Sequence, residues 1–285
     1  MGKVAILTDS TSYIPQEYIT RYKITVVPLV LIWGQETLED GVDILPNEFY
    51  RRLATSKIMP TTSQVAIPTV HKAYASLIEQ GYDVLGIFLS SKLSGTIQSA
   101  IQARELLPAP AREKVEIVDS LSTAMAMGFH ILTAARAAED GASLRDCRLL
   151  AEKAAQHTGL YFVVDTLEFL HRGGRIGGAQ RFLGTALNLK PVLALRDGKV
   201  DAIERIRTKG KALERLVEIV VEQCAGKAPI RMAALHANAQ AEAQSVLDSA
   251  CERLNVTEKA ITELSPVVGT HTGPGTVGLA YMADM

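Results

Sequence analysis

The chain has 285 residues, of which 47% are hydrophobic and 21% charged, and its formal net charge is −1. This composition is typical of a globular protein long enough for two α/β domains. The near-zero charge excludes a global attraction to nucleic acid, and a single Trp33 among few aromatic residues disfavours stacking on single strands. The longest apolar stretch, residues 24–33, is too short to cross a membrane. Three widely spaced cysteines and no visible signal peptide predict a cytoplasmic protein with reduced thiols.

Strand-length apolar runs alternate with segments of helical period through the first half of the chain. We expect a helix starting near Pro15, strands at 4–7, 24–33, 84–89 and 115–118, and helices over 47–54, 68–80, 96–107 and 122–138. Such alternation builds parallel strands joined by helices that cover both faces of the sheet. Residues 1–158 are therefore predicted to form a three-layer α/β/α domain with a parallel sheet.

The pattern changes after about residue 158. Strands are expected at 160–164, 189–195, 200–206 and 230–235, and helices at 210–224 and 239–254. Asp197-Gly198 is a hairpin signal, so residues 200–206 are predicted to return antiparallel. Residues 159–285 are therefore predicted to form an α/β domain with a mixed sheet and helices on one side. No Gly/Ser or Pro linker separates the halves, and we expect them to pack tightly.

Hydroxyl-rich loops follow three strands of the first half. They are residues 8–12, 90–96 and 119–122, and residues 60–64 form a fourth hydroxyl-rich loop. In a parallel sheet such loops meet at the carboxyl edge, where ligands bind. Hydroxyl groups combined with free amides at helix starts can bind an anion. Plain N-capping of the helices explains any one loop better, but for the four loops taken together both interpretations remain open.

Two glycine-rich segments and a basic stretch carry further candidate residues. The segment 170–178 places Arg172 and Arg175 among four glycines, and 269–275 surrounds His271 with glycines. Farther along, Arg205 and Arg207 precede two lysines in alternating positions. Each has a structural alternative: a tight turn, a buried histidine or a solvated charged face. The apparent G-x-G-x-x-G at 273–278 lacks a following βαβ unit, so we reject a dinucleotide site.

Several enzyme classes lack their sequence signatures. The chain has no phosphate-binding G-x-x-x-x-G-K-[ST] loop, no G-x-S-x-G nucleophile elbow and no metal-ligand spacing among its histidines and cysteines. An enzyme acting on a small phosphorylated or acyl substrate, with Asp9 or Ser94 as nucleophile, is kept as the alternative function. The sequence near Ser94 shows no general base and no group to orient such a base, which disfavours this enzyme function.

Five ordered motifs resemble those of the DegV family, from Lys3 to about Tyr281. They are Thr8-Asp9-Ser10-Thr11-Ser12, Pro60-Thr61-Thr62-Ser63-Gln64, Leu93-Ser94-Gly95-Thr96, Gly173-Gly174-Arg175-Ile176 and Gly269-Thr270-His271-Thr272-Gly273. The resemblance implies a fatty-acid-binding protein of two α/β domains with the lipid between them. It also implies a non-catalytic carrier subunit, which presents the acid to a separate ATP-dependent fatty-acid kinase that makes acyl phosphate in bacterial phospholipid metabolism.

The resemblance assigns roles to particular residues. Thr62, Ser63, Ser94 and His271 would bind the carboxylate, and Arg175, Arg205 and Arg207 would meet the kinase. It implies no cofactor or metal, no nucleic-acid partner and at most transient membrane contact. A chain of about 14–18 carbons would be bound mainly through its methylenes, each contributing ~0.8 kcal/mol. One departure is Val65-Ala66-Ile67-Pro68, since many members have proline directly after the glutamine.

Overall fold

The structure is a computed structural model that describes residues 2–183 and 189–285. Its N-terminal half contains the predicted parallel sheet. The order of this sheet is β2-β1-β6-β7, with every pair parallel. The strands are β1 (Lys3–Asp9), β2 (Thr25–Val27), β6 (Tyr82–Phe88) and β7 (Val115–Asp119). The apolar side chains of the two central strands, β1 and β6, are almost all buried, as expected for a sheet covered on both faces.

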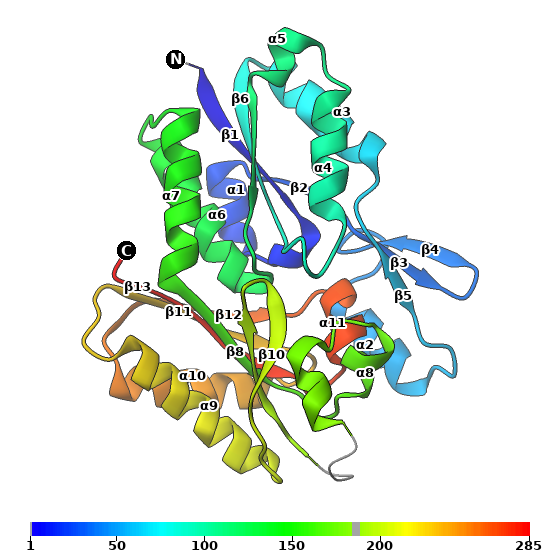
Figure 1. The fold of residues 1–285 in the computed structure, drawn as a ribbon, viewed down its shortest axis with the longest axis vertical. Coiled ribbons are helices and arrows are strands. Elements are labelled where there is room, and N and C mark those ends of the chain that lie inside the picture. The colour runs from blue at the N-terminus through cyan, green and yellow to red at the C-terminus, as the bar shows by residue number, and fades with distance from the viewer. Residues whose placement is uncertain (1, 184–188) are drawn as a thin grey trace.

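Helices cover both faces of this sheet, with α3 and α4 on one side and α6 and α7 on the other (Figure 1). The helices of this half are α1 (Gln16–Tyr22), α2 (Pro46–Thr55), α3 (Ile67–Glu79), α4 (Thr96–Glu105), α5 (Ala109–Arg112), α6 (Ala124–Glu139) and α7 (Leu144–His157). A short 3-10 turn, η1 (Ser10–Ser12), follows β1. Sequence reasoning missed α5 and α7, although Ser143 caps α7 by accepting a hydrogen bond from the Asp146 amide.

The single strand predicted at 24–33 is wrong, because the chain divides there between two sheets. β2 ends at Val27, and β3 (Val30–Trp33) instead pairs antiparallel with β4 (Glu36–Glu39) and β5 (Thr61–Ser63). Pro28 has no N–H for a sheet ladder, and the Leu29 amide donates to Ser10 Oγ at 3.1 Å. The segment 60–64, predicted as a loop, therefore contains a strand of this small sheet.

The C-terminal half contains the predicted mixed sheet, in the order β10-β9-β8-β13-β11-β12. Its strands are β8 (Thr158–Val163), β9 (Val192–Arg196), β10 (Lys199–Glu204), β11 (Ile230–His236), β12 (Val256–Glu263) and β13 (Val277–Ala283). Within this sheet, β11 and β12 are the only described strands that pair in parallel. The helices α9 (Lys209–Cys224) and α10 (Gln240–Arg253) pack on one face (Figure 1). The molecule is thus the predicted two-domain α/β protein.

The β9–β10 hairpin has the turn that its sequence predicts. Asp197 and Gly198 have φ angles of 48° and 78°, so both central residues adopt the left-handed conformation of a type I′ turn. The hairpin tip reaches the other half of the molecule, where Ser90 Oγ donates to the Gly198 carbonyl at 2.8 Å. The hairpin therefore joins the two sheets at the loop that follows β6.

One apolar core runs through both halves. Helix α6 packs against β1 of the parallel sheet and also against β8, β11 and β13 of the mixed sheet. A second connection is made by Tyr50, whose hydroxyl donates to the Leu264 carbonyl at 3.0 Å. The division at residues 158 and 159 stays a prediction, since α7 ends at His157 and β8 follows directly. Among the described residues, every helix is too short or too polar to traverse a lipid bilayer.

Candidate functional site

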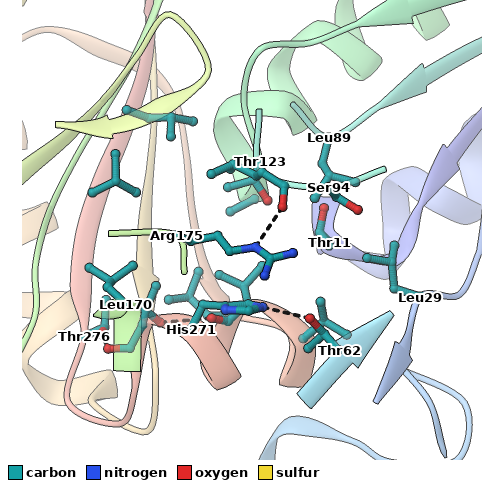
Figure 2. Close-up of a pocket in the computed structure, with 18 of the residues that line it drawn as sticks. Thr11, Leu29, Thr62, Leu89, Ser94, Thr123, Leu170, Arg175, His271 and Thr276 are labelled. Atoms are coloured by element: carbon teal, nitrogen blue, oxygen red, sulfur yellow. Dashed lines mark hydrogen bonds between the residues drawn. The ribbon is translucent and has the colours of Figure 1, made fainter. Parts of the chain in front are cut away.

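A cavity of about 240 Å³ lies where the carboxyl edge of the parallel sheet faces the inner side of the mixed sheet. The side chains around it come from segments far apart in sequence (Figure 2). The short helices α8 (Glu168–Arg172) and α11 (Pro266–Thr272) complete its wall, and a 3-10 segment, η2 (Gly177–Phe182), follows α8. The predicted convergence of loops at this edge is present in part. Thr11 and Ser94 of the first two loops line the cavity, whereas the third loop contributes Ser120 and Ser122 to a separate chamber, and only Thr123, just after it, lines this one.

The mixed sheet supplies an apolar wall. Four of its strands and helix α11 contribute aliphatic and aromatic side chains: Leu160, Phe162, Leu195, Val200, Leu235, Val267 and Val268. Sequence reasoning did not identify these residues as lining a cavity. Strand β8 is buried on both faces, so its sequence lacks the alternation that would have separated core-facing from cavity-facing positions. This wall can bind a hydrocarbon chain and offers little to a polar substrate.

The polar part of the cavity is centred on Thr62 and His271. Thr62 Oγ1 and His271 Nε2 are 2.8 Å apart, and they join β5 to α11 across 209 positions of sequence (Figure 2). His271 lies in the last turn of helix α11, where a glycine-rich loop was predicted. That prediction is wrong because Ser265 caps a helix that starts with Pro266, a residue suited to a first turn.

The environment of His271 keeps its ring neutral. Burial, together with the positive charge of Arg175, lowers the pKa of His271 to about 4. Gly173 packs directly against Nδ1 of the ring, so a methyl group at residue 173 would collide with it. Near neutral pH, His271 can therefore donate one hydrogen bond and accept another without carrying charge.

Ser94 and Ser63 also line the cavity. Ser94 Oγ lies 3.0 Å from Thr96 Oγ1 and accepts from the Thr96 amide at 3.3 Å, immediately before helix α4. The Gln64 side chain lies where a β-carbon of residue 95 would be, so a larger residue than Gly95 would displace it. Ser63 lines the cavity but is exposed. Thr62, Ser63 and Ser94 thus all line one cavity.

Arg175 extends from the C-terminal half to the Ser94 loop. Its Nε donates to the Leu93 carbonyl at 3.0 Å, and its Nη1 donates to the Gly173 carbonyl at 2.6 Å. Figure 2 shows its guanidinium group between His271 and Ser94. Arg175 was predicted to contact a partner protein, and the structure places it in the cavity wall with fixed positive charge near the hydroxyl groups.

Arg205 and Arg207 are exposed and do not line this cavity. Both follow β10, which ends at Glu204, and precede helix α9. The Arg205 guanidinium lies 4.8 Å from the centre of the Phe182 ring, and its Nη2 donates to the Arg181 carbonyl at 3.3 Å. These two arginines are therefore separated from the Arg175 cluster with which they were grouped.

The geometry does not equip Asp9 or Ser94 for nucleophilic catalysis. Asp9 is fully buried, with Oδ1 accepting from the Thr11 amide and hydroxyl and Oδ2 accepting from the Leu89 amide at 2.7 Å. Burial raises the pKa of Asp9, which joins the ends of β1 and β6. Ser94 is bonded to Thr96, while the histidine in this cavity is bonded to Thr62. Within the described ranges, no group of three His, Cys, Asp or Glu side chains could hold a metal ion.

Comparison with known proteins identifies the family. The sequence model of the DegV family matches residues 3–284. The chain belongs to the DegV family. A DegV domain-containing protein of Streptomyces coelicolor is 39% identical over 97% of each chain.

Solved DegV-family structures have the same fold. A fatty-acid-binding DegV family protein from Thermus thermophilus is 35% identical, with 99% of each chain covered and a TM-score of 0.92. The DegV protein of Bacillus subtilis, described as fatty-acid binding, is 32% identical, with 99% of this chain and all of that chain covered and a TM-score of 0.90. The family resemblance predicted from the five motifs is therefore confirmed.

Proposed function

We propose that this DegV-family protein binds one long-chain fatty acid and presents its carboxylate to a separate ATP-dependent kinase, which forms the acyl phosphate. The observation that carries the proposal is a cavity with an aliphatic wall and one polar group of side chains, Thr62, Ser94, His271 and Arg175. An amphipathic acid matches both parts. The fatty-acid-binding relatives support the same ligand class.

The apolar contacts to the tail and the polar contacts to the carboxylate have different roles in binding the fatty acid. Burying ~14 methylenes contributes roughly 11 kcal/mol before the cost of association. Hydrogen bonds to a carboxylate contribute about 1.5–3 kcal/mol each. The tail therefore supplies most of the affinity, and the hydroxyl groups with Arg175 set the direction in which the acid lies. Direction matters for a carrier, because the partner enzyme must reach the carboxylate.

The kinase partner is part of the proposal for a chemical reason. Making an acyl phosphate requires a phosphoryl donor, and the sequence carries no phosphate-binding loop of the G-x-x-x-x-G-K-[ST] type. We propose that Arg205 and Arg207, which are exposed, form the docking surface for that enzyme. Their guanidinium groups are permanently charged and suit acidic or phosphate-bearing surfaces.

Native mass spectrometry of the freshly purified protein tests the proposal. We expect one bound fatty acid of about 14–18 carbons per chain, released on denaturation, because an aliphatic wall holds it by burial of its methylenes. The delipidated protein should take up one equivalent of hexadecanoic acid and, mixed with the kinase and ATP, yield acyl phosphate. Purified protein that carries no lipid and binds none after delipidation would contradict the proposal.

A further inference from the structure

A second histidine is buried without hydrogen-bond partners in helix α6, between the two sheets. His130 is 1% exposed, and neither ring nitrogen has a partner among the described residues. Burial lowers its pKa to about 4, so the ring is neutral and carries one donor and one acceptor. Buried polar groups rarely lack a hydrogen-bond partner. The two ring nitrogens of His130 therefore indicate that a hydrogen-bonding group from a bound molecule lies beside them.

A small chamber lies next to His130. It has a volume of about 150 Å³, and its lining includes Ser120, Ser122, Thr158 and His130. Leu160 and Leu195 line both this chamber and the main cavity, so the two cavities adjoin at these residues. An acyl chain that packs on Leu160 and Leu195 in the main cavity would therefore lie next to the chamber.

The free polar groups of the chamber define what it can bind. The Ser120 hydroxyl already donates to the Ser122 carbonyl at 3.2 Å, and the Thr158 hydroxyl donates to the Ala154 carbonyl at 2.8 Å. The hydroxyl oxygens of Ser120 and Thr158 can each still accept a hydrogen bond, while the His130 ring can donate one hydrogen bond and accept one. No lysine or arginine is among the described lining residues, and Asp197 is one of them, so a second carboxylate would be repelled.

We propose that this chamber recognises a hydroxyl group on the chain of the bound fatty acid, beyond Leu160 and Leu195, through His130. The inference rests on the proposed fatty-acid function and narrows its substrate class to hydroxylated acids. A hydroxyl group donates and accepts, which is what the unpaired imidazole requires. A plain hydrocarbon end would leave both ring nitrogens unpaired in a chamber with polar walls.

Paired ligands test this recognition. Delipidated wild-type protein and the His130→Leu variant would be titrated with hexadecanoic acid and with hexadecanoic acids hydroxylated at mid-chain or at the terminal carbon. The preference is the ratio of the affinity for a hydroxy acid to the affinity for hexadecanoic acid. For at least one hydroxyl position, this ratio should be at least five times larger in the wild type than in His130→Leu. His236→Leu is the matched control: His236 is also buried, but it lines neither cavity and should leave the preference unchanged.

The same titrations can also contradict the inference that His130 recognises a hydroxyl group. Equal preferences in the wild type and His130→Leu at every hydroxyl position would mean that water alone satisfies His130. Should His130→Leu fail to fold, judged by its melting curve, His130→Phe retains an aromatic ring without the nitrogens and is expected to lose the same preference. Failure of unsubstituted hexadecanoic acid to bind wild-type protein would contradict the proposed function itself, and this inference with it.

Discussion

Thr62 in strand β5 and Ser94 in the loop before helix α4 both line the cavity. Loss of either hydroxyl by Thr62→Val or Ser94→Ala should weaken fatty-acid binding by about 10- to 150-fold, since one hydrogen bond to a carboxylate contributes about 1.5–3 kcal/mol, and the buried tail should still retain the lipid. Acyl phosphate formation by the kinase should fall much more, because the carboxylate is no longer held in one direction. Binding titrations and turnover measurements on the same preparations separate the two effects.

Ser91→Ala is the matched control for Ser94→Ala. Ser91 belongs to the same loop, is exposed, and bonds Asp119 through its backbone amide, so its hydroxyl group is dispensable. It should behave as the wild type in both assays. A folded Thr62→Val or Ser94→Ala protein that retains no lipid would show that the hydroxyl groups, rather than the tail, dominate affinity.

His271 predicts a pH dependence for binding. In the free protein its pKa is lowered to about 4, so the ring is neutral. A carboxylate bound beside it favours the imidazolium ion and raises that pKa, so binding takes up protons in the interval above pH 4. Affinity should therefore increase as pH falls through that interval.

Isothermal titration calorimetry checks this proton uptake. Titrating dodecanoate near pH 6 in buffers of different ionisation enthalpy gives the number of protons bound, which should be positive in the wild type. His271→Gln removes the titrating ring, and uptake should drop toward zero. If His271→Gln took up as many protons as the wild type, another group would be responsible and His271 would be distant from the carboxylate.

At the scale of elements, the β9–β10 hairpin connects the two sheets across the cavity. Gly198 has a φ of 78°, and the Ser90 hydroxyl occupies the place of a β-carbon. Gly198→Ala should therefore cost about 1–2 kcal/mol of folding free energy and lower the melting temperature by roughly 2–4 °C. It should also speed fatty-acid release, because the hairpin tip no longer fits against the loop after β6.

Gly210→Ala provides the comparison for Gly198→Ala. Gly210 lies in the first turn of α9 with open space around its β-carbon position, so alanine should be neutral or slightly stabilising. Differential scanning calorimetry and a fluorescent-lipid displacement assay measure both variants. Equal melting temperatures and release rates for the two would mean that the Ser90 contact does not couple the sheets.

Helices, strands and turns could be predicted from the sequence where the backbone preferences of neighbouring residues determine them. The turn at Asp197-Gly198 and the helix that begins at Pro46 follow from backbone preferences, and both are present. The strand predicted over 24–33 failed because apolar character alone does not show that Pro28 divides it between two sheets. The helix around His271 was missed because its glycines resemble a loop, although Gly269 is helical and packs on Tyr50.

The candidate site was predictable only in part, because its residues meet through tertiary packing. Hydroxyl-rich loops at strand ends placed Ser94 at a common edge, since parallel strands end together. Nothing in local sequence indicates that Thr62 bonds a histidine from α11, or that Arg175 crosses to the Leu93 carbonyl. Those contacts arise from docking one half of the molecule on the other.

At the scale of the whole molecule, Arg205 and Arg207 define the surface proposed for kinase docking. Replacing both with alanine should leave lipid binding and the melting temperature unchanged, because both are exposed and lie outside the cavity lining. Kinase turnover on the loaded protein should fall tenfold or more, equivalent to about 1.4 kcal/mol. The double replacement of Arg145 and Arg253, which are also exposed, removes the same charge elsewhere and should not affect turnover. Equal turnover in both double variants would place the docking surface elsewhere.

A crystal structure of the protein loaded with hexadecanoic acid tests the central claim most directly. The carboxylate should lie within hydrogen-bond distance of Thr62 and Ser94, near His271 and Arg175, with the chain extending along the wall formed by Leu160, Phe162 and Leu235. That orientation follows from placing the charge among hydroxyl and guanidinium groups and the methylenes against the mixed sheet. A carboxylate at the opposite end of the cavity, or a lipid bound outside it, would contradict the account.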